Sequence, residues 1–397
     1  MCGPAESDVK FMWISVNGDL AISGENTESN GMNTYLVGSF GEHNGGDDAF
    51  VEVALDGLAR YCKPSKVIAH SRTPLSTSRG VVKPEVTRRY FKGQNSIQRF
   101  LNTRNLSRIL YAGGGIHTDA NVLRGQRRIL ERNPECLSAA VGVSVWPLKD
   151  QVTIDECRRL LEKFSFIGVR GRASFERLRQ MDVQARYELT FDIAVLLRVM
   201  MSQSHFQVEH GNRSVGVSLR ACDQLGPPNL NCDEKRINFV AAILNELIEG
   251  NKCSVHLIDF CSHREFGDYD ILERLRSKLL NGVPIYHERY DDDPIGLLKR
   301  VMRVNCMIAM RLHAAVFAYT CNIPCLFLPY EDKCLEWADM AGLPGDDVVD
   351  PVHGSVHAYA RRLSAMLANK KGNAMTPLSA AIKAAQRNWD VLAELGF

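Results

Sequence analysis

A regular alternation of short apolar runs and amphipathic segments extends through most of the chain and constrains its fold more than any other feature. The first clear unit, residues 33–61, has a β-branched and aromatic run that ends at glycines and is followed by a helical apolar pattern. The same unit recurs in both halves of the chain, with a late copy at residues 306–320. Strands that alternate with helices form parallel sheets covered on both faces, so the sequence predicts a doubly wound α/β protein.

The length and one polar segment predict two domains. A chain of 397 residues exceeds what one ordinary core holds. The polar segment 202–213 interrupts the alternation. We therefore expect a Rossmann-like domain over residues 1–205, a second over residues 206–372, and a cleft between them. The pattern of residues 373–397 predicts a last amphipathic helix that packs on one of the domains. We assign no structure to residues 1–30.

Composition excludes several classes of protein. The first residues lack the basic and apolar regions of a signal peptide, and no apolar run reaches the about 18 residues of a membrane-spanning helix. Apolar residues make up 45% of the chain and charged residues 24%, as in globular proteins. The 12 cysteines are scattered without a CxxC pair, so we expect free thiols in a reducing compartment and a cytoplasmic location.

Positive charge gathers in one part of the first predicted domain. Residues 60–133 carry 16 Lys and Arg but only three acidic residues, Glu85, Asp119 and Glu131. Such a field concentrates anionic ligands or attracts the protein to an anionic surface; a solvated basic face without a partner is the alternative. The aromatic residues there match no stacking module and no nucleic-acid-binding motif occurs, so we expect no nucleic-acid partner.

The first predicted strand is followed by a glycine-rich loop, residues 38–48. Its glycines allow a tight turn and a close backbone approach, and Asp47 or Asp48 suits the N-cap of the next helix. The spacing does not fit the GxGxxG turn of dinucleotide-binding proteins, which argues against a NAD-dependent oxidoreductase. Two interpretations stay open: a turn with a helix cap, or a loop whose Asn44 and Asp47 contact a substrate hydroxyl.

Two further strand ends carry candidate binding residues. The triple glycine that contains Gly114 and Gly115 ends a strand where another group must come close to the backbone. Asp119 follows, and it could cap a helix, hydrogen-bond sugar hydroxyls or act as a base. Arg170 and Arg172 are two residues apart, so in an extended segment both point the same way. They predict an anion site, with ordinary surface arginines as the alternative.

The second predicted domain has cationic or titratable side chains at three strand ends. Arg220 ends its first strand, Arg311 and His313 follow an apolar strand, and Lys333 follows the next one. A helix expected to begin near Ala314 would add N–H groups at the same place. A lone histidine near a core is usually structural. Together, however, these four side chains predict a cationic pocket for a small, multiply charged anion, with the histidine as its titratable member.

Together these motifs resemble the polysaccharide pyruvyl transferases. The most specific is the Arg-Leu-His box at 311–313, followed by a small-residue helix, a proline and Tyr-x-x-Lys. Met310 stands where the family often has Ser, and residues 43–47 (HNGGD) stand where it often has Gly-Asn-x-Gly-Asp. The matching segments keep the family's order and cover roughly residues 33–343: GSFGEHNGGDDAF, YAGGGIHTD, GVRGRASFERL, LTFDIAVLL, VGVSLR, MRLHAAVFAYTCNIPCLFLPYEDK and WADMAGL.

The resemblance implies a GT-B-like fold and a phosphoenolpyruvate-dependent pyruvyltransferase. The product would be a cyclic pyruvate ketal on a pair of saccharide hydroxyls, in exopolysaccharide or cell-surface glycan biosynthesis. By matching motif, Arg220, Arg311 and His313 would hold the donor, and Asp119 would lie across the cleft. We expect His313 to serve as acid–base catalyst, Asp119 as base on the acceptor, and Lys333 near the leaving phosphate. Cationic side chains compensate the negative charge of the donor, so we expect that no metal or cofactor is required.

The expected partners are phosphoenolpyruvate and a saccharide acceptor. If that acceptor is lipid-diphosphate-linked, the basic face of residues 60–133 favours peripheral contact with the anionic inner face of the membrane. Acceptor specificity is expected in loops such as 72–105. Two alternatives remain: a GT-B-type glycosyltransferase that uses a nucleotide sugar, and a non-catalytic protein that binds acidic saccharides. The first alternative would require an acidic residue that binds a ribose and an apolar slot that holds a base, and the sequence near 306–333 has neither. The second alternative would need neither His313 nor Asp119.

Overall fold

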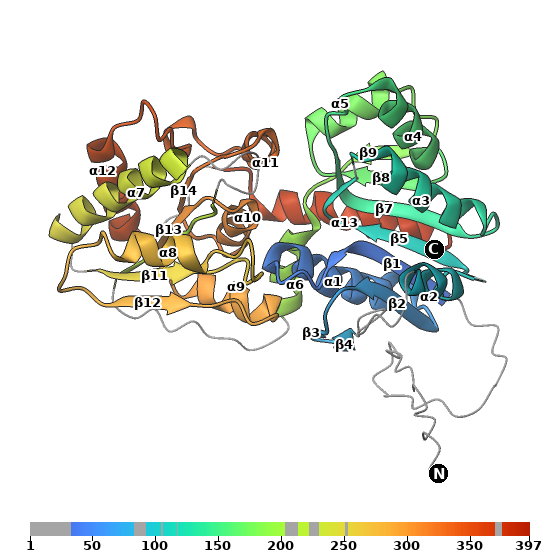
Figure 1. Cartoon of the computed structure of the whole chain (residues 1–397), viewed down its shortest axis with the longest axis horizontal. Helices are drawn as coiled ribbons and strands as arrows, with labels where there is room; N and C mark the ends of the chain where they lie inside the picture. Colours follow the sequence, from blue (N-terminus) through green and yellow to red (C-terminus); the bar gives the residue numbers. More distant parts are fainter. Residues whose placement is uncertain are drawn as a thin grey trace, which may run out of the picture.

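The computed structural model describes most of the chain. The polar segment 202–213, except its two end residues, and the unassigned residues 1–30 lie outside the described part. Figure 1 shows two lobes, each a sheet flanked by helices. No helix in the described part is long and apolar enough to cross a membrane. The described ranges are 33–82, 93–104, 106–116, 118–202, 213–221, 230–250, 253–369 and 375–397.

The first domain is built on a seven-stranded parallel sheet. Its order is β2-β1-β5-β7-β8-β9, and β6 pairs with β7. A separate antiparallel hairpin, β3 (Leu75–Thr77) and β4 (Gly80–Val82), follows β2. The sheet strands are β1 (Asn33–Phe40), β2 (Lys66–Ser71), β5 (Arg108–Ala112), β6 (Gly115–Ile116), β7 (Leu137–Val145), β8 (Phe166–Val169) and β9 (Tyr187–Leu189).

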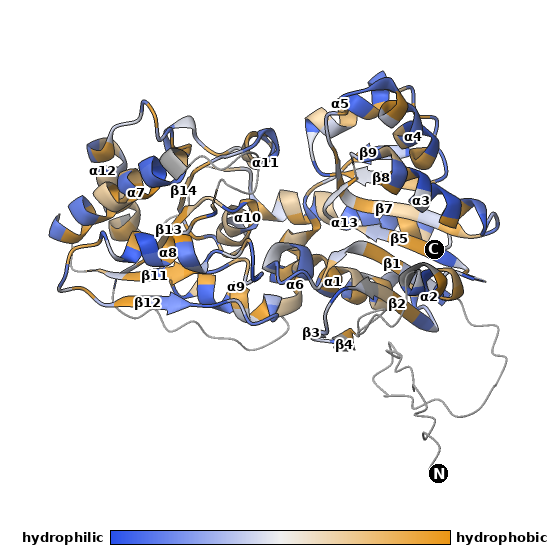
Figure 2. Ribbon diagram, in the orientation of Figure 1, coloured by the Kyte–Doolittle hydropathy of each residue, from blue (hydrophilic) through white to orange (hydrophobic). Residues whose placement is uncertain are grey.

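Alternate side chains of this sheet enter two different cores. Leu36 and Leu110 pack toward α1 and α13, whereas Tyr35 and Ile109 pack toward α3, α4 and α5. Figure 2 shows the consequence: largely apolar strands lie between helices whose outer faces are polar. The helices are α1 (Gly45–Gly57), α3 (Ala120–Glu131), α4 (Gln151–Leu161), α5 (Arg172–Gln180) and α13 (Leu378–Glu394).

The second domain is a five-stranded parallel sheet of order β12-β11-β10-β13-β14. Helices α7, α8 and α12 cover one face, and α9 and α10 cover the other. The predicted fold class, two Rossmann-like doubly wound sheets, is confirmed. The elements are β10 (Ser214–Ser218), α7 (Leu230–Gly250), β11 (Ser254–Ile258), α8 (Tyr269–Arg276), β12 (Ile285–Glu288), α9 (Pro294–Met302), β13 (Cys306–Ala309), α10 (Leu312–Thr320), β14 (Cys325–Phe327) and α12 (Val356–Asn369).

Each sheet reverses its strand order at one place. In the first domain the chain winds outward from β1 to β2 and then crosses to β5 on the other side; in the second it winds from β10 to β12 and crosses to β13. In open α/β sheets, ligands bind outside the carboxyl ends of the strands at such a reversal. The loops that follow β1 and β5, and those that follow β10 and β13, are therefore the places to look for a site.

The last helix, α13, returns from the second domain to pack on the first (Figure 1). It contacts β7, β8 and two short turns, η1 (Leu58–Cys62) and η2 (Ile193–Leu196). Trp389 of α13 is fully buried and stacks on Tyr61, with ring centroids 6.4 Å apart. The carboxyl end of the chain thus adds to the core of its amino-terminal half.

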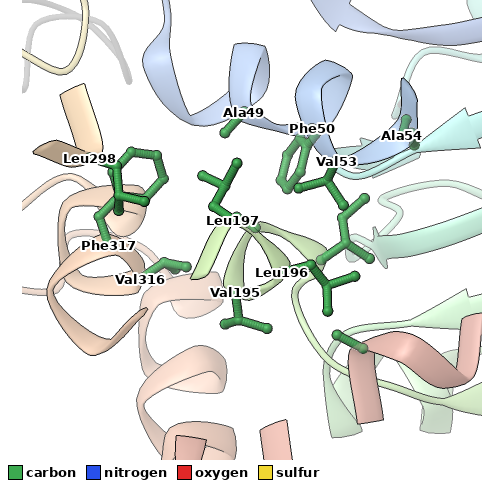
Figure 3. Packing of buried hydrophobic residues seen from close by; sticks show 14 of the residues in the cluster. Ala49, Phe50, Val53, Ala54, Val195, Leu196, Leu197, Leu298, Val316 and Phe317 are labelled. Carbon is green, nitrogen blue, oxygen red and sulfur yellow. The ribbon is translucent and has the colours of Figure 1, made fainter. Parts of the chain in front are cut away.

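One apolar cluster runs through both domains. Figure 3 shows Phe50 and Val53 of α1 on one side of Leu197, which begins α6 (Leu197–Ser202), with Leu298 of α9 and Phe317 of α10 on the other. All five side chains are buried. Burying a side chain of this kind contributes roughly 1.5–3 kcal/mol, so the two domains share a core that opposes their separation.

Polar contacts fix the orientation across this shared core. The backbone of Gly45 donates to the carbonyl of Phe260 at 2.8 Å, and that of Ser262 donates to the carbonyl of His43 at 2.9 Å. These bonds join the loop after β1 to the segment after β11. The glycine-rich loop of the first domain is therefore bound to the second domain by its backbone.

A buried carboxyl group adds a second link between the domains. Asp48 of α1 accepts from the backbone of Gly41 and from the hydroxyl of Tyr290, both at 2.8 Å. Burial raises the pKa of Asp48 to about 7, although both hydrogen bonds favour its ionised form. The hydroxyl of Tyr290 thus stabilises a charge that burial disfavours.

We predict that Tyr290→Phe destabilises the protein by about 1–3 kcal/mol, because it leaves a buried carboxylate oxygen without its donor. The hydroxyl stabilises the ionised carboxylate, so the loss should be larger above pH 7 than below it. Urea unfolding at several pH values measures both effects. Tyr286→Phe, at a tyrosine that is 51% exposed, is the control. Equal stability of the two variants would contradict the link.

Candidate functional site

A cavity of about 210 Å³ lies where the carboxyl ends of the two sheets face each other. Its walls come from the loops after β1, β5, β8, β10, β13 and β14, so both strand-order reversals contribute. The second domain supplies most of the positive charge, and the first supplies glycines and the carboxyl group of Asp47. Nine of the residues selected from sequence line it: Asn44, Asp47, Gly114, Gly115, Arg170, Arg220, Arg311, His313 and Lys333.

Arg311 is held rigidly at the start of α10. Its Nε and Nη2 donate to one carboxylate oxygen of Asp268 at 2.9 and 2.5 Å, and Nη2 also donates to the carbonyl of Phe266. Burial disfavours the charge of Arg311, but the neighbouring Asp268 outweighs this effect and raises the pKa of the guanidinium. The charge is therefore permanent, and its position at the cavity wall is fixed before any ligand arrives.

His313 lies in the first turn of α10, which begins at Leu312 with Arg311 as its N-cap. Its ring packs edge-on against Phe50, with centroids 5.1 Å apart, and its Nε2 is buried without a hydrogen-bond partner among the described residues. Burial, together with the positive charges of Arg170, Lys333 and Arg311, lowers the pKa of His313 to about 4, although the carboxylate of Asp192 opposes this shift. The imidazole is therefore neutral near pH 7. An anion bound among these cations would raise its pKa.

Arg170 and Asp192 form a buried ion pair beside the histidine. Arg170 Nη1 donates to Asp192 Oδ2 at 2.5 Å, and its Nε donates to the hydroxyl of Ser144 at 2.9 Å. The same Oδ2 lies 3.9 Å from Nε2 of His313. Asp192 is almost fully buried, so its charge requires these partners. The pair fixes the guanidinium at the wall and holds a carboxylate near Nε2 of the imidazole.

Two aromatic rings support the remaining cations. Arg220 donates to the hydroxyl of Tyr330 at 2.9 Å, and its guanidinium lies 4.9 Å from the centroid of that ring. Lys333 Nζ lies 5.4 Å from the same ring and 5.0 Å from the ring of Trp146, and it pairs with Glu331. Such cation–π contacts keep the charges at the cavity surface instead of letting them turn into solvent.

Asp47 is the carboxyl group of the cavity. It lies in the first turn of α1, where Asn44 Nδ2 donates to its Oδ2 at 2.7 Å. Burial raises the pKa of Asp47 to about 6, the positive charge of Arg170 opposes this rise, and Glu42 adds to it. Asp47 therefore exchanges its proton near neutral pH, as a general acid or base must. The predicted helix cap is corrected here, since Asn44, and neither Asp47 nor Asp48, is the N-cap.

Glycines allow close packing around the cavity, both within the first domain and between the two domains. A Cβ on Gly46 would overlap the imidazole of His313, and one on Gly115 would overlap the indole of Trp146. Gly113 and Gly114 have φ values of 64° and 71°, a conformation that favours glycine. The triple glycine is therefore required both by the turn after β5 and by the packing around the cavity.

Two residues selected from sequence lie outside the cavity. Asp119 is exposed and caps α3, accepting from the backbones of Asn121 and Val122 at 2.8 and 3.1 Å. Arg172 is 70% exposed, 3.5 Å from Asp339 on the surface. The expectation that Arg170 and Arg172 share a direction was wrong, because the chain leaves β8 and enters α5 between them, which ends the two-residue period of a strand.

The sequence did not identify several residues that shape the cavity. Asp192 and Asp268 hold Arg170 and Arg311, and Trp146 and Tyr330 support Lys333. One signal for Asp192 was available: an acidic residue inside the apolar run 191–197 is buried and must have a cationic partner. Within the described residues, no group of three or more His, Cys, Asp and Glu side chains could hold a metal ion.

A larger groove of about 1040 Å³ adjoins the cavity in the first domain. Ser39, Gly114, Gly115 and Ile116 line both spaces, so the two are neighbours along the turn after β5. Its floor is formed by side chains of the sheet, and its walls by α3 and by α2 (Gln94–Asn102). Four arginines line it: Arg72, Arg99, Arg128 and Arg132.

Comparison with solved structures defines the class of fold. UDP-GlcNAc 2-epimerase from Methanocaldococcus jannaschii matches with a TM-score of 0.58 at 10% identity, covering 91% of this chain and 100% of that one. Trehalose-6-phosphate synthase OtsA gives 0.54 at 9% identity, with 92% and 98% covered. The UDP-GlcNAc 2-epimerase from Neisseria meningitidis gives 0.53 at 8% identity, with 92% and 100% covered. The chain therefore has the GT-B fold of two Rossmann-like domains.

The family follows from the sequence match. The model of the polysaccharide pyruvyl transferase family matches residues 44–332, most of the chain, and the chain belongs to this family. The matched region begins at the N-cap of α1 and ends in the first turn of α11 (Asp332–Ala341), so it contains nearly every residue of the cavity. No protein in the search of curated sequences matches the chain significantly.

We predict that His313 titrates near pH 4 in the ligand-free protein, because it is buried among three cations. Asp192→Asn should lower this pKa further, since it removes the carboxylate that opposes them. Histidine ring signals followed by NMR against pH measure both values. Titration of His313 at the ordinary value near 6.5 would contradict the account.

Proposed function

We propose that the cavity binds phosphoenolpyruvate and that the protein transfers its enolpyruvyl-derived group to two hydroxyls of a saccharide, forming a cyclic pyruvate ketal. The cluster of Arg170, Arg220, Arg311 and Lys333 around His313 carries this proposal. Family membership favours the same reaction. We place the reaction in the cytoplasm, in exopolysaccharide or cell-surface glycan biosynthesis.

The size and charge of the cavity suit a small donor. Phosphoenolpyruvate has a carboxylate and a phosphate, which guanidinium groups bind through paired hydrogen bonds. The cavity volume of about 210 Å³ lies below the roughly 300–1,000 Å³ of pockets for drug-sized ligands. A three-carbon phosphate therefore matches it better than a nucleotide sugar does. The fixed positions of Arg170 and Arg311 mean that little side-chain ordering accompanies binding.

His313 is the proposed acid. The three negative charges of the donor offset the surrounding cations, so binding raises the pKa of the imidazole and allows it to take up a proton. In the proposed reaction this proton moves to the methylene carbon of the donor, and C2 becomes electrophilic. The carboxylate of Asp192, 3.9 Å from Nε2 of His313, stabilises the imidazolium before transfer.

Asp47 is the proposed base, in place of Asp119. It lines the cavity, and its pKa near 6 lets it accept the proton of an attacking hydroxyl at neutral pH. The hydroxyl oxygen bonds to C2, and the C–O bond to phosphate then breaks. The second hydroxyl closes the ring and loses its proton. One proton enters the methyl group and two leave the hydroxyls, so the products are the ketal and hydrogen phosphate.

The adjoining groove is the proposed acceptor site. At about 1040 Å³ it is large enough for several sugar rings, and it shares Gly114 and Gly115 with the cavity as lining residues. Four arginines at its walls favour an acceptor that is itself anionic. A saccharide lying in the groove would present its hydroxyls to the donor's C2 from the side of the first domain.

Calorimetric titration with phosphoenolpyruvate and with UDP tests the donor. We predict saturable binding of phosphoenolpyruvate and a Kd raised about 10- to 100-fold by Arg220→Ala, which removes charge-assisted bonds of roughly 1.5–3 kcal/mol. Arg179→Ala, a 71% exposed arginine on α5, is the control. Binding of UDP without binding of phosphoenolpyruvate would favour a nucleotide-sugar glycosyltransferase. Binding of saccharides alone would favour a non-catalytic protein.

Kinetics of three variants test the assignment of acid and base. We predict that His313→Gln and Asp47→Asn each lower kcat about 10²- to 10⁴-fold, measured as phosphate released from phosphoenolpyruvate with oligosaccharide acceptors. Asp119→Asn should keep nearly normal turnover, since asparagine also caps helices well. An inactive Asp119→Asn variant would restore the assignment made from sequence.

The pH profile tests Asp47 separately. A base must be ionised to act, so kcat/KM should rise with pH through about 6, the pKa of Asp47 in the free protein. Asp47→Asn should remove this rise. A profile that falls through pH 6 would mean that Asp47 acts as the acid.

A further inference from the structure

Helix α2 exposes apolar side chains on one side. Ile97, Phe100 and Leu101 are 52%, 44% and 51% exposed, at the i, i+3 and i+4 spacing of one helical face. The polar Gln98 and Asn102 of the same helix are less exposed and bond to each other at 3.1 Å. A helix that covered a core would show the opposite arrangement. This apolar face is therefore available to a partner.

Arginines border the apolar face. Arg132 of the α3 end and Arg104 place their guanidinium carbons 5.1 and 5.9 Å from the centroid of the Phe100 ring. Arg99 and Arg128 lie on the same two helical segments and are exposed. We call the three apolar and four basic side chains together the α2 face: Ile97, Phe100, Leu101, Arg99, Arg104, Arg128 and Arg132.

The acidic side chains on the same two segments already have partners within the protein. Residues 93–104 contain no acidic residue, and residues 118–132 contain Asp119 and Glu131. Asp119 caps α3, and Glu131 pairs with Arg127. Elsewhere in the described part, exposed apolar residues such as Val152 and Leu335 have no comparable cluster of arginines in their own helical turn. The α2 face thus combines exposed apolar area with a cluster of arginines.

We propose that the α2 face docks the protein on an anionic phospholipid bilayer. Helices that lie in a membrane interface pair an apolar face with basic residues, and phosphate headgroups attract those residues while the apolar side chains enter the acyl boundary. Charge complementarity favours the bilayer over a second copy of this basic chain, whose α2 face would repel it. The docking rests on the α2 face, none of whose residues lines the donor cavity.

Docking of this kind would bring the acceptor groove to the membrane. Arg99, Phe100, Arg128 and Arg132 belong to the α2 face and also line the groove. The groove therefore opens at the docked side and leads inward to the donor cavity at Gly114 and Gly115. If the proposed function holds, the acceptor is a saccharide anchored in that bilayer and reached without dissociation of the protein.

Co-sedimentation of the purified full chain with vesicles tests the docking. We expect binding to vesicles that contain phosphatidylglycerol, little binding to pure phosphatidylcholine, and loss of binding at high salt. Replacing Arg128 and Arg132 by Glu should weaken the partition coefficient at least about fivefold per arginine. Ile97→Ser with Leu101→Ser should weaken it as well. Equal sedimentation with both lipids, or none with either, would overturn the proposal.

Matched controls separate docking from changes in folding and self-association. Val152→Ser and Leu335→Ser alter apolar residues that are 60% and 50% exposed on other helices, and they should sediment like the unchanged protein. Thermal unfolding of every variant shows that the fold is kept. A dimer in size-exclusion chromatography that only the α2 variants convert to monomer would assign the face to a second copy and overturn the proposal. Binding of phosphoenolpyruvate is measured without vesicles, so a failure of the proposed function can be distinguished from a failure of the membrane docking.

Discussion

The hydrogen bonds between the loop after β1 and the segment after β11 are the constraint on which the site depends. They hold Gly45 against Phe260 and His43 against Ser262, so the carboxyl ends of two separate sheets meet face to face. Each sheet alone offers half a site: glycines and Asp47 on one side, cations and His313 on the other. The shared apolar core behind them keeps this arrangement, and Gly46 permits the close contact with the imidazole.

Electrostatics in this closed space favour a particular kind of ligand. Burial and three cations keep His313 neutral near pH 7. Burial raises the pKa of Asp47 to about 6, so this carboxyl group can gain or lose a proton near neutral pH. The buried partners Asp192 and Asp268 fix two of the guanidinium groups but leave the cavity wall positive. A small polyanion completes the charge balance and, in doing so, changes the protonation of the histidine. Donor binding and readiness for acid catalysis are thereby coupled through one physical effect.

The fold and much of the cavity followed from sequence because of one topological rule. Apolar runs alternating with helices predict parallel sheets, and charged residues directly after such runs gather at the carboxyl edge, as Arg220 and Arg311 do. Where the chain turns into a helix the rule is less reliable: His313 and Lys333 in the first turns of α10 and α11 line the cavity, whereas Arg172 and Asp119 at the starts of α5 and α3 lie outside it. The apolar run around Asp192 indicates that this carboxylate is buried and needs a cationic partner, but which cation it meets, here Arg170, depends on how distant loops pack.

Proton uptake on donor binding tests the central claim most directly. Calorimetry of phosphoenolpyruvate binding near pH 6, repeated in buffers of different ionisation enthalpy, counts the protons taken up by the complex. The account predicts uptake approaching one proton on His313, which starts with a pKa near 4, and a clearly smaller uptake in His313→Gln. Binding without any proton uptake, or with the same uptake in both proteins, would contradict the coupling of the cationic cavity to its histidine.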